Sequence, residues 1–565
     1  MSRKTGQKVA ILGALTVAGA LHVGAAPAEP LAERLPGQSV LYVEWAGWDA
    51  IKNANAATPF GKLLADPAVS KLVDEVLRAA RLAIGKKAAA QGQVQLADAG
   101  LRVLDTLAHK RVALDVLGVS MTETGPSPEI VLAVDVGANS VEFVKALETL
   151  TAGLGGHSPP YRLPPPVAEE VDGYAFKRYA LPFAPAIRYG VVDGVFLLTA
   201  GEETTGKVLA TLKGKDVTVA KDQRFGAAIR TIGTKDRTTC LVAHLDVKTL
   251  LSQARRAWEA MSQTQTFPPR VEVILEAAGV NKLESVTLAS QIAHGGYRHS
   301  MFVALPSDQD PPRWMKQAPV SDAQLAMIPK DATLAKAANF RLSDFYDDLM
   351  HVLEALGSEV SAPVLNAQAM AEAKMGLRIK KDILDLLDDG WVVYDAPSNG
   401  GLFFTGVTLI VEAKDAEGVS NLLKRLVGFV DAQVGPGVAR VERIDYRNHA
   451  VYYVSITDPP LPIAPAWGVY GRQVIVAFYP QMVMRCIDHL SSKGASKSIL
   501  DNPDFVRGRK LLPPDASMIA YVDTKAAMED LYRVLLPLAT VGCAFAQGEG
   551  VPINASMIPR QETFA

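Results

Sequence analysis

Cysteine is scarce in this chain of 565 residues, which has only Cys240, Cys486 and Cys543. These three lie far apart and lack C-x-x-C spacing, which argues against a zinc site and against a disulfide framework. Charged residues make up only 21% of the chain, whereas 49% of its residues are hydrophobic. This balance excludes a disordered chain, so we expect globular domains held together by hydrophobic cores.

The motifs of common hydrolases and of nucleic-acid-binding proteins are missing. No G-x-S-x-G nucleophile elbow occurs, and no pair of the nine histidines has the H-E-x-x-H spacing of a zinc protease. His294 and His299 flank Gly295-Gly296, which predicts an exposed loop rather than a metal site. The formal charge of −2 and the lack of a sustained basic run argue against a nucleic-acid or anionic-membrane partner.

The N-terminus carries an export signal. Basic residues at 3, 4 and 8 precede an apolar run from Val9 to Leu21, and Ala26-Pro27-Ala28 follows. The run of about 13 apolar residues is shorter than the ~20 needed to span a bilayer, so we interpret residues 1–28 as a cleaved signal peptide. We therefore expect a protein exported to the periplasm or cell surface, with no membrane span after cleavage.

A repeated phrase indicates an internal duplication. Leu181–Ala186 and Leu461–Ala466 both read L-P-x-A-P-A and lie 461 − 181 = 280 residues apart. Phe225 and Phe505 have the same offset. A period this long exceeds the ~20 to 50 residues of a solenoid repeat, so each copy should be a domain with its own core.

Each copy mixes strand and helix patterns. Ile130–Val136 and Val407–Val411 predict buried strands, and Asp66-Pro67 predicts the start of an amphipathic helix. Strands and helices do not alternate strictly, so the fold class is α+β in a tandem duplication rather than a parallel doubly wound sheet. The predicted divisions are a signal peptide at 1–28, a first α+β unit at 34–235, a partial unit and connector at 236–324, a second α+β unit at 325–511, and an incomplete third unit opening at 512–565.

One segment looks like a phosphate loop. Gly201–Lys207 matches G-x-x-x-x-G-K, but Val208 stands where a Ser or Thr should bind magnesium. Glu202 and Glu203 would also repel a polyphosphate, and Tyr479–Arg485 in the second copy has neither glycine nor lysine. We therefore predict no nucleotide and no other cofactor.

Four acids recur at the repeat offset and are candidates for a duplicated active site: Asp105 with Asp385, and Asp115 with Asp395. Such carboxylates more often face water or cap backbone amides. Asp246 and Asp523 follow short strands and are expected to cap the next helices. We therefore assign no catalytic, cofactor-binding or metal-binding residue.

The chain resembles a family of uncharacterised exported bacterial proteins built from a repeated domain of unknown function. The resemblance depends on proline-led turns at Leu35-Pro36, Ile328-Pro329 and Leu512-Pro513, each before a short apolar strand, and on the Asp66-Pro67 helix start. It implies export, and it implies no catalytic residues.

The function expected from the sequence is that of an exported, non-enzymatic interaction or structural protein. The alternative is a periplasmic or cell-surface hydrolase, or a small-ligand binding protein, with a site between the two units. The expected partner is an unidentified protein or a component of the cell envelope. The apolar segment from Leu531 to Phe545 is expected to pack on the second copy or else to drive self-association.

Cleavage after Ala28 can be checked directly. We predict that exported protein begins at or near Glu29, because the signal elements occur in the order that the export machinery reads. N-terminal sequencing of protein recovered outside the cytoplasm measures this, and an intact Met1 on that material would refute the prediction.

Overall fold

The computed structural model describes residues 30–548, apart from 123–124, 156–163, 180–184, 234–236, 262–268, 294–295, 307–315, 401–405, 436, 457–462 and 493–495. The predicted signal peptide, residues 1–28, lies outside the described residues. So do His294, residues 181–184 of the first repeated hexapeptide and residues 461–462 of the second.

The chain divides into two compact units. The first is formed mainly by Met1–Pro269 and Asn281–Gln309, and the second mainly by Asp310–Pro537. The second unit therefore begins before the predicted boundary at Leu325. The reason is that Val320 already belongs to the hydrophobic core of this unit, together with Leu325.

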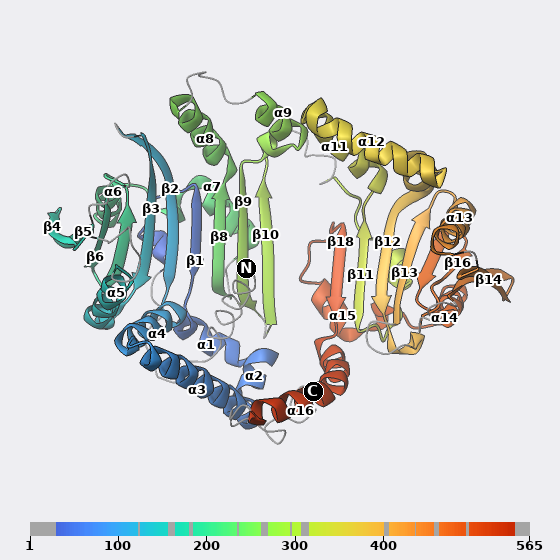
Figure 1. The fold of residues 1–565 in the computed structure, drawn as a ribbon, viewed down its shortest axis with the longest axis horizontal. Helices are drawn as coiled ribbons and strands as arrows, with labels where there is room; N and C mark the ends of the chain where they lie inside the picture. The colour runs from blue at the N-terminus through green and yellow to red at the C-terminus, as the bar shows by residue number, and fades with distance from the viewer. Residues whose placement is uncertain are drawn as a thin grey trace. The chain divides into compact units, whose positions relative to one another are not determined.

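The first unit contains a ten-stranded antiparallel sheet in the order β10-β9-β8-β1-β2-β3-β7-β6-β5-β4 (Figure 1). Its strands are β1 Leu41–Trp45, β2 Val112–Thr122, β3 Gly125–Asp135, β4 Val167–Val171, β5 Tyr174–Tyr179, β6 Ile187–Val192, β7 Val195–Ala200, β8 Thr238–Asp246, β9 Ser285–Ala293 and β10 Gly296–Ala304.

The second unit contains an eight-stranded antiparallel sheet in the order β14-β15-β16-β17-β13-β12-β11-β18. Its strands are β11 Leu334–Asn339, β12 Leu387–Asp395, β13 Val407–Ala413, β14 Ala439–Tyr446, β15 His449–Ile456, β16 Ala466–Tyr470, β17 Gln473–Ala477 and β18 Met518–Val522.

Helices connect the strands. The α-helices are α1 Trp48–Ala56, α2 Pro59–Ala65, α3 Pro67–Ala90, α4 Val94–His109, α5 Ser140–Gly155, α6 Thr204–Leu212, α7 Gln223–Ile232, α8 Val247–Met261, α9 Pro269–Ala277, α10 Asp322–Ala326, α11 Leu342–Ala355, α12 Ser358–Met375, α13 Ala416–Val434, α14 Pro480–Ser491, α15 Pro503–Arg509 and α16 Thr524–Gly548. Short 3-10 helical turns include η1 Leu31–Glu33, η3 Val219–Lys221 and η7 Leu384–Leu386. The predicted cap at Asp66 is confirmed, since its side chain accepts from the N–H groups of Ala68 and Val69.

Both faces of the first sheet are covered. On one face, Tyr42 of β1 packs with Leu209 of α6 and Phe225 of α7. On the other face, Phe196 of β7 meets Phe143 of α5 edge-on, with ring centres 5.1 Å apart. An antiparallel sheet between helices confirms the α+β class.

The two sheets share one order of eight strands. β8-β1-β2-β3-β7-β6-β5-β4 of the first has the same sequence of connections as β18-β11-β12-β13-β17-β16-β15-β14 of the second. An isolated bridge joins Pro36 to Thr218 in the first unit, and another joins Pro329 to Ser498 in the second. In each unit a capped helix follows the bridge. Asp222 caps the N-terminus of α7, and Asn502 caps that of α15.

Strand pairing defines counterpart positions. Residues of β1 and β11 correspond at the spacing of the two bridge prolines, 329 − 36 = 293, so that Tyr42 corresponds to Ala335. Tyr42 pairs with Asp115 of β2, whereas Ala335 pairs with Tyr394 of β12. The counterpart of Asp115 is therefore Tyr394.

This register corrects the interpretation of Asp115 and Asp395 as equivalent residues. The two strands are shifted by one residue relative to the repeat offset, and a shift of one residue moves a side chain to the opposite face of a sheet. Asp115 is accordingly fully buried, while Asp395 is partly exposed. The expectation that Asp115 faces water or caps a backbone amide is wrong.

β8 lies in the predicted partial unit at 236–324, and β18 lies in the predicted unit opening at 512–565. Each of these strands completes a sheet. β8 pairs with β1 in the first unit, and β18 pairs with β11 in the second. Asp246 accepts from the N–H of Thr249 and Asp523 accepts from that of Ala526, which confirms both predicted helix caps. In α16, Leu538, Val541 and Phe545 are exposed.

One aromatic contact recurs in both units. Phe225 meets His244 of β8 edge-on at 5.5 Å, and Phe505 meets Tyr521 of β18 edge-on at 5.5 Å. Both phenylalanines are buried, so each joins the helix after the bridge to its sheet.

We predict that Phe225→Ala and Phe505→Ala each destabilise their own unit by about 3–5 kcal/mol, because each leaves a cavity in a packed core. Hydrogen exchange read by mass spectrometry measures this separately for the two sheets. Phe225→Ala should lower protection in β1 and β8 but not in β11 and β18, and Phe505→Ala should do the reverse. Equal loss of protection in both sheets would contradict the division into two cores.

Candidate functional site

A cavity of about 420 Å³ lies in the first unit, lined by η1, α7 and strands of the sheet. α7 contributes Phe225, Gly226 and Arg230, and the sheet contributes Glu44 among others. Its volume lies within the ~300–1,000 Å³ of small-molecule sites, which combine an apolar lining with a few polar groups. The cavity lies inside one unit, so it differs from the predicted site between the two units, which stays a prediction.

Glu44 is the centre of the cavity's polar contacts. Its carboxylate accepts hydrogen bonds from the Tyr42 hydroxyl, from Arg111 Nη1 and, at 3.2 Å, from the N–H of Ala32 in η1. Only 5% of Glu44 is exposed, and a buried charge is tolerated only when it is paired. Burial, with the neighbouring Glu44 charge, raises the pKa of Tyr42 well above its usual value, so this phenol stays a neutral donor.

Asp115 is a second buried acid beside this cluster. Neither of its carboxylate oxygens has a hydrogen-bond partner among the residues that the structure describes, and the Ser39 hydroxyl donates to the Pro36 carbonyl oxygen at 3.0 Å instead. Burial raises the pKa of Asp115 to about 7. Asp115 does not line the cavity, so it does not face a ligand there.

The second unit lacks this polar cluster. Its counterparts of Tyr42, Glu44, Arg111 and Asp115 are Ala335, Ala337, Gly390 and Tyr394. The same strand order therefore forms without the buried charges. We infer that the sheet does not need the cluster in order to fold, and that the cluster has a function specific to the first unit.

Cys240 lines the cavity but is not an activated nucleophile. The residue is 5% exposed, and burial raises the pKa of its thiol to about 11. Reactive cysteines need a lowered pKa, because the thiolate is the nucleophile. Cys240 lies in β8 and packs there as a small hydrophobic residue, in one cluster with Ile292.

The segment that looks like a phosphate loop has another use. Lys207 lies in α6, where its Nζ contacts both carboxylate oxygens of buried Glu129 at 2.7 and 2.8 Å. The lysine is thus committed to an ion pair that ties α6 to β3. Glu202 accepts from Arg188 Nη2 at 3.4 Å, so this loop is part of a structural ion-pair network.

The structure does not bring the recurring acids together. Asp105 lies in α4 and Asp385 in η7, so these two occupy different kinds of element. Their side chains are 63% and 45% exposed, and Asp385 pairs with Lys380 at 2.9 Å. His299 is exposed as expected, but it lies in β10 rather than in a loop. None of these residues lines the cavity.

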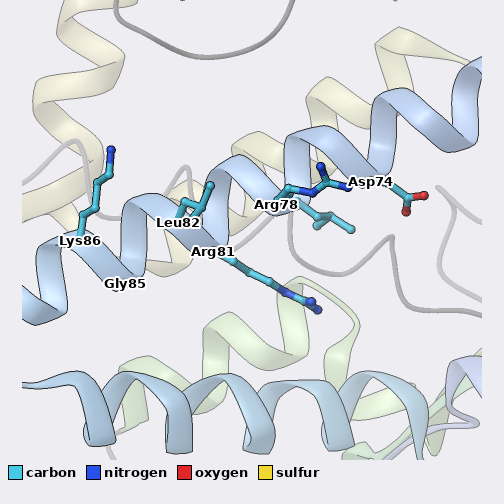
Figure 2. A pocket seen from close by; sticks show the side chains of 7 residues that line it. Asp74, Arg78, Arg81, Leu82, Gly85 and Lys86 are labelled. Carbon is cyan, nitrogen blue, oxygen red and sulfur yellow. The ribbon is translucent and has the colours of Figure 1, made fainter.

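A second hollow, of about 670 Å³, follows α3 (Figure 2). Its described lining residues, which include Asp74, Arg78, Arg81 and Lys86, all come from this one helix. Arg78 pairs with Glu75 at 3.2 Å on the exposed helix surface. Residues on a single helix do not converge on a ligand, so we do not regard this hollow as a site.

In the described part of the chain, no group of three or more His, Cys, Asp or Glu side chains is placed to hold a metal ion. No helix among those residues is long and apolar enough to cross a membrane.

Sequence reasoning missed Glu44 and Arg111 as site residues. The available signal was an acid two positions after Tyr42 in a strand of alternating burial, which places both side chains on one face. Its partner Arg111 is 67 residues away, and no local pattern links the two.

The titration of Asp115 gives a test of its burial. Its folded pKa of about 7 exceeds the ~3.9 of an unfolded Asp, so the folded protein binds more protons between these values. Stability should therefore fall as the pH rises from about 4 to 7, by at most about 1.4 kcal/mol per pH unit, and then level off. Asp115→Asn should lack this fall. Urea unfolding of both proteins at pH 4, 5.5, 7 and 8 measures it, and parallel pH profiles would contradict the raised pKa.

Comparisons with known proteins give no further assignment. No family model, no curated protein and no solved structure matches this chain.

Proposed function

We propose that this protein is an exported, non-enzymatic binding protein whose first unit takes a small ligand in the cavity beside Glu44 and Arg111. One observation carries the proposal: a buried ion pair lines a cavity of about 420 Å³ in the first unit, and its counterparts in the second unit are Ala337 and Gly390. Buried charges are costly and are kept where they orient something.

The chemistry of the cavity favours binding over hydrolysis. A general base needs a carboxylate that can accept a proton from substrate, but Glu44 already accepts three hydrogen bonds from the protein. A nucleophile needs activation, whereas the pKa of Cys240 is raised to about 11. These contacts suit a rigid binding site.

Export and duplication are further parts of the proposal. Export is supported by the basic and apolar N-terminal pattern and by the resemblance to exported repeat proteins. Duplication is supported by the common order of eight strands and by the paired bridges of Pro36 and Pro329. The two copies would then have diverged, with the first specialised for binding.

Filling the cavity tests the proposed function. Gly226 lines the cavity inside α7, and a Cβ there would lie 3.2 Å from the movable Arg230 guanidinium and 3.7 Å from Ala220 O. Gly226→Leu should therefore fold and should abolish the binding of small apolar fragments found by a thermal-shift screen of the purified protein. The matched control is Thr231→Leu, at an exposed position of the same helix, which should bind as the unchanged protein does.

Circular dichroism and hydrogen exchange confirm the fold of each variant, and calorimetry gives the affinities. We expect at least a tenfold loss of affinity for Gly226→Leu. The proposal fails if no fragment binds, or if fragments bind both variants equally well.

A further inference from the structure

The second unit shows what occupies the corresponding space there. Asn339 of β11 donates from Nδ2 to the carbonyl oxygens of Ala318 at 3.0 Å and Pro319 at 2.7 Å. The N–H of Val320 donates to Ala516 O at 2.9 Å, and the Val320 side chain is buried in the core. A segment of peptide backbone without helix or strand is thus held against the sheet.

The same positions in the first unit line the cavity. By strand register, Asn339 corresponds to Ala46 and Ala516 corresponds to Thr239. The N–H of Ala46 donates to Cys240 O at 2.8 Å, just as the N–H of Asn339 donates to Ser517 O at 2.9 Å. Ala46, Thr239 and Cys240 are all cavity-lining residues. The cavity therefore lies where the second unit holds a segment of its own backbone.

The two units have their side-chain donor on different strands. It follows from the register that the donor is Asn339 of β11 in the second unit and Arg111, just before β2, in the first. In the second unit Asn339 is the donor and its cross-strand partner is Gly390, which has no side chain. A Cβ on Gly390 would lie only 2.8 Å from Glu412 Oε2, so a larger residue would be crowded there. In the first unit the small residue is Ala46. Trp45 pairs with Val112, so Arg111 is the residue opposite Ala46. A guanidinium can donate to peptide carbonyl oxygens as the Asn339 amide does.

We propose that the cavity of the first unit binds a short peptide segment with small apolar side chains, in the manner of Ala318–Val320 in the second unit. The inference rests on the proposed function and names its ligand class. Arg111, held by Glu44, donates to carbonyl oxygens of the peptide, and Phe225 lies against its apolar side chain as Phe505 shares a core with Val320.

The test uses the protein that begins at Glu29 and the capped tripeptide acetyl-Ala-Pro-Val-amide, which copies residues 318–320. Calorimetry should detect binding, and Gly226→Leu should weaken it at least tenfold. Thr231→Leu should leave it unchanged. Acetyl-Asp-Pro-Asp-amide should not bind, because its acidic side chains would lie against apolar lining residues such as Phe225 and Ile229.

A double variant tests the role of Arg111. Glu44→Ala with Arg111→Gly gives the first unit the residues of the second, Ala337 and Gly390, and removes both charges together so that neither is left unpaired. It should fold and lose binding of the tripeptide at least tenfold.

Failure of this inference is distinguishable from failure of the proposed function. If apolar fragments bind the unchanged protein and are lost in Gly226→Leu, but the tripeptide does not bind, the cavity is a ligand site and the peptide class is wrong. Tripeptide binding that survives in Gly226→Leu would also overturn the inference.

Discussion

The first unit depends on keeping one buried carboxylate paired. Glu44 lies on the central strand β1 between β8 and β2, and it accepts from Tyr42, from Arg111 and from the backbone of η1. These contacts join Glu44 to its own strand β1, to the residue just before β2 and to the turn η1. Because an unpaired charge at this depth would cost several kcal/mol, the three partners must be assembled together. Glu44 and Arg111 both line the cavity, so the ion pair contributes to its polar surface.

The second unit shows that the sheet itself needs no such charge. Ala335, Ala337 and Tyr394 give its corresponding strands an apolar face, and Gln324 and Asn339 bond to each other at 2.5 Å at the edge of the core. Its own residues 318–320 fill the remaining space. The same order of eight strands thus occurs with this polar cluster and without it. The positions that differ include Tyr42 and Glu44 on β1 and Arg111 just before β2.

The α+β class could be predicted from the sequence because apolar alternation and helix caps are local. The caps at Asp66, Asp246 and Asp523 were identified for the same reason, since each requires only the residue and the two or three that follow it. The recurring Asp115 and Asp395 were misleading, because a shift of one residue in strand register cannot be seen in a repeat offset. The Glu44–Arg111 pair was missed because only the pairing of β1 with β2 brings those residues together.

The most direct measurement of the central claim is a crystal structure of the protein that begins at Glu29, grown with acetyl-Ala-Pro-Val-amide. The account predicts continuous density for the peptide in the cavity of the first unit, with its carbonyl oxygens within hydrogen-bond distance of the Arg111 guanidinium and a small side chain against Phe225. A cavity filled by the protein's own side chains, with Glu44 and Arg111 closed off from any ligand, would contradict it.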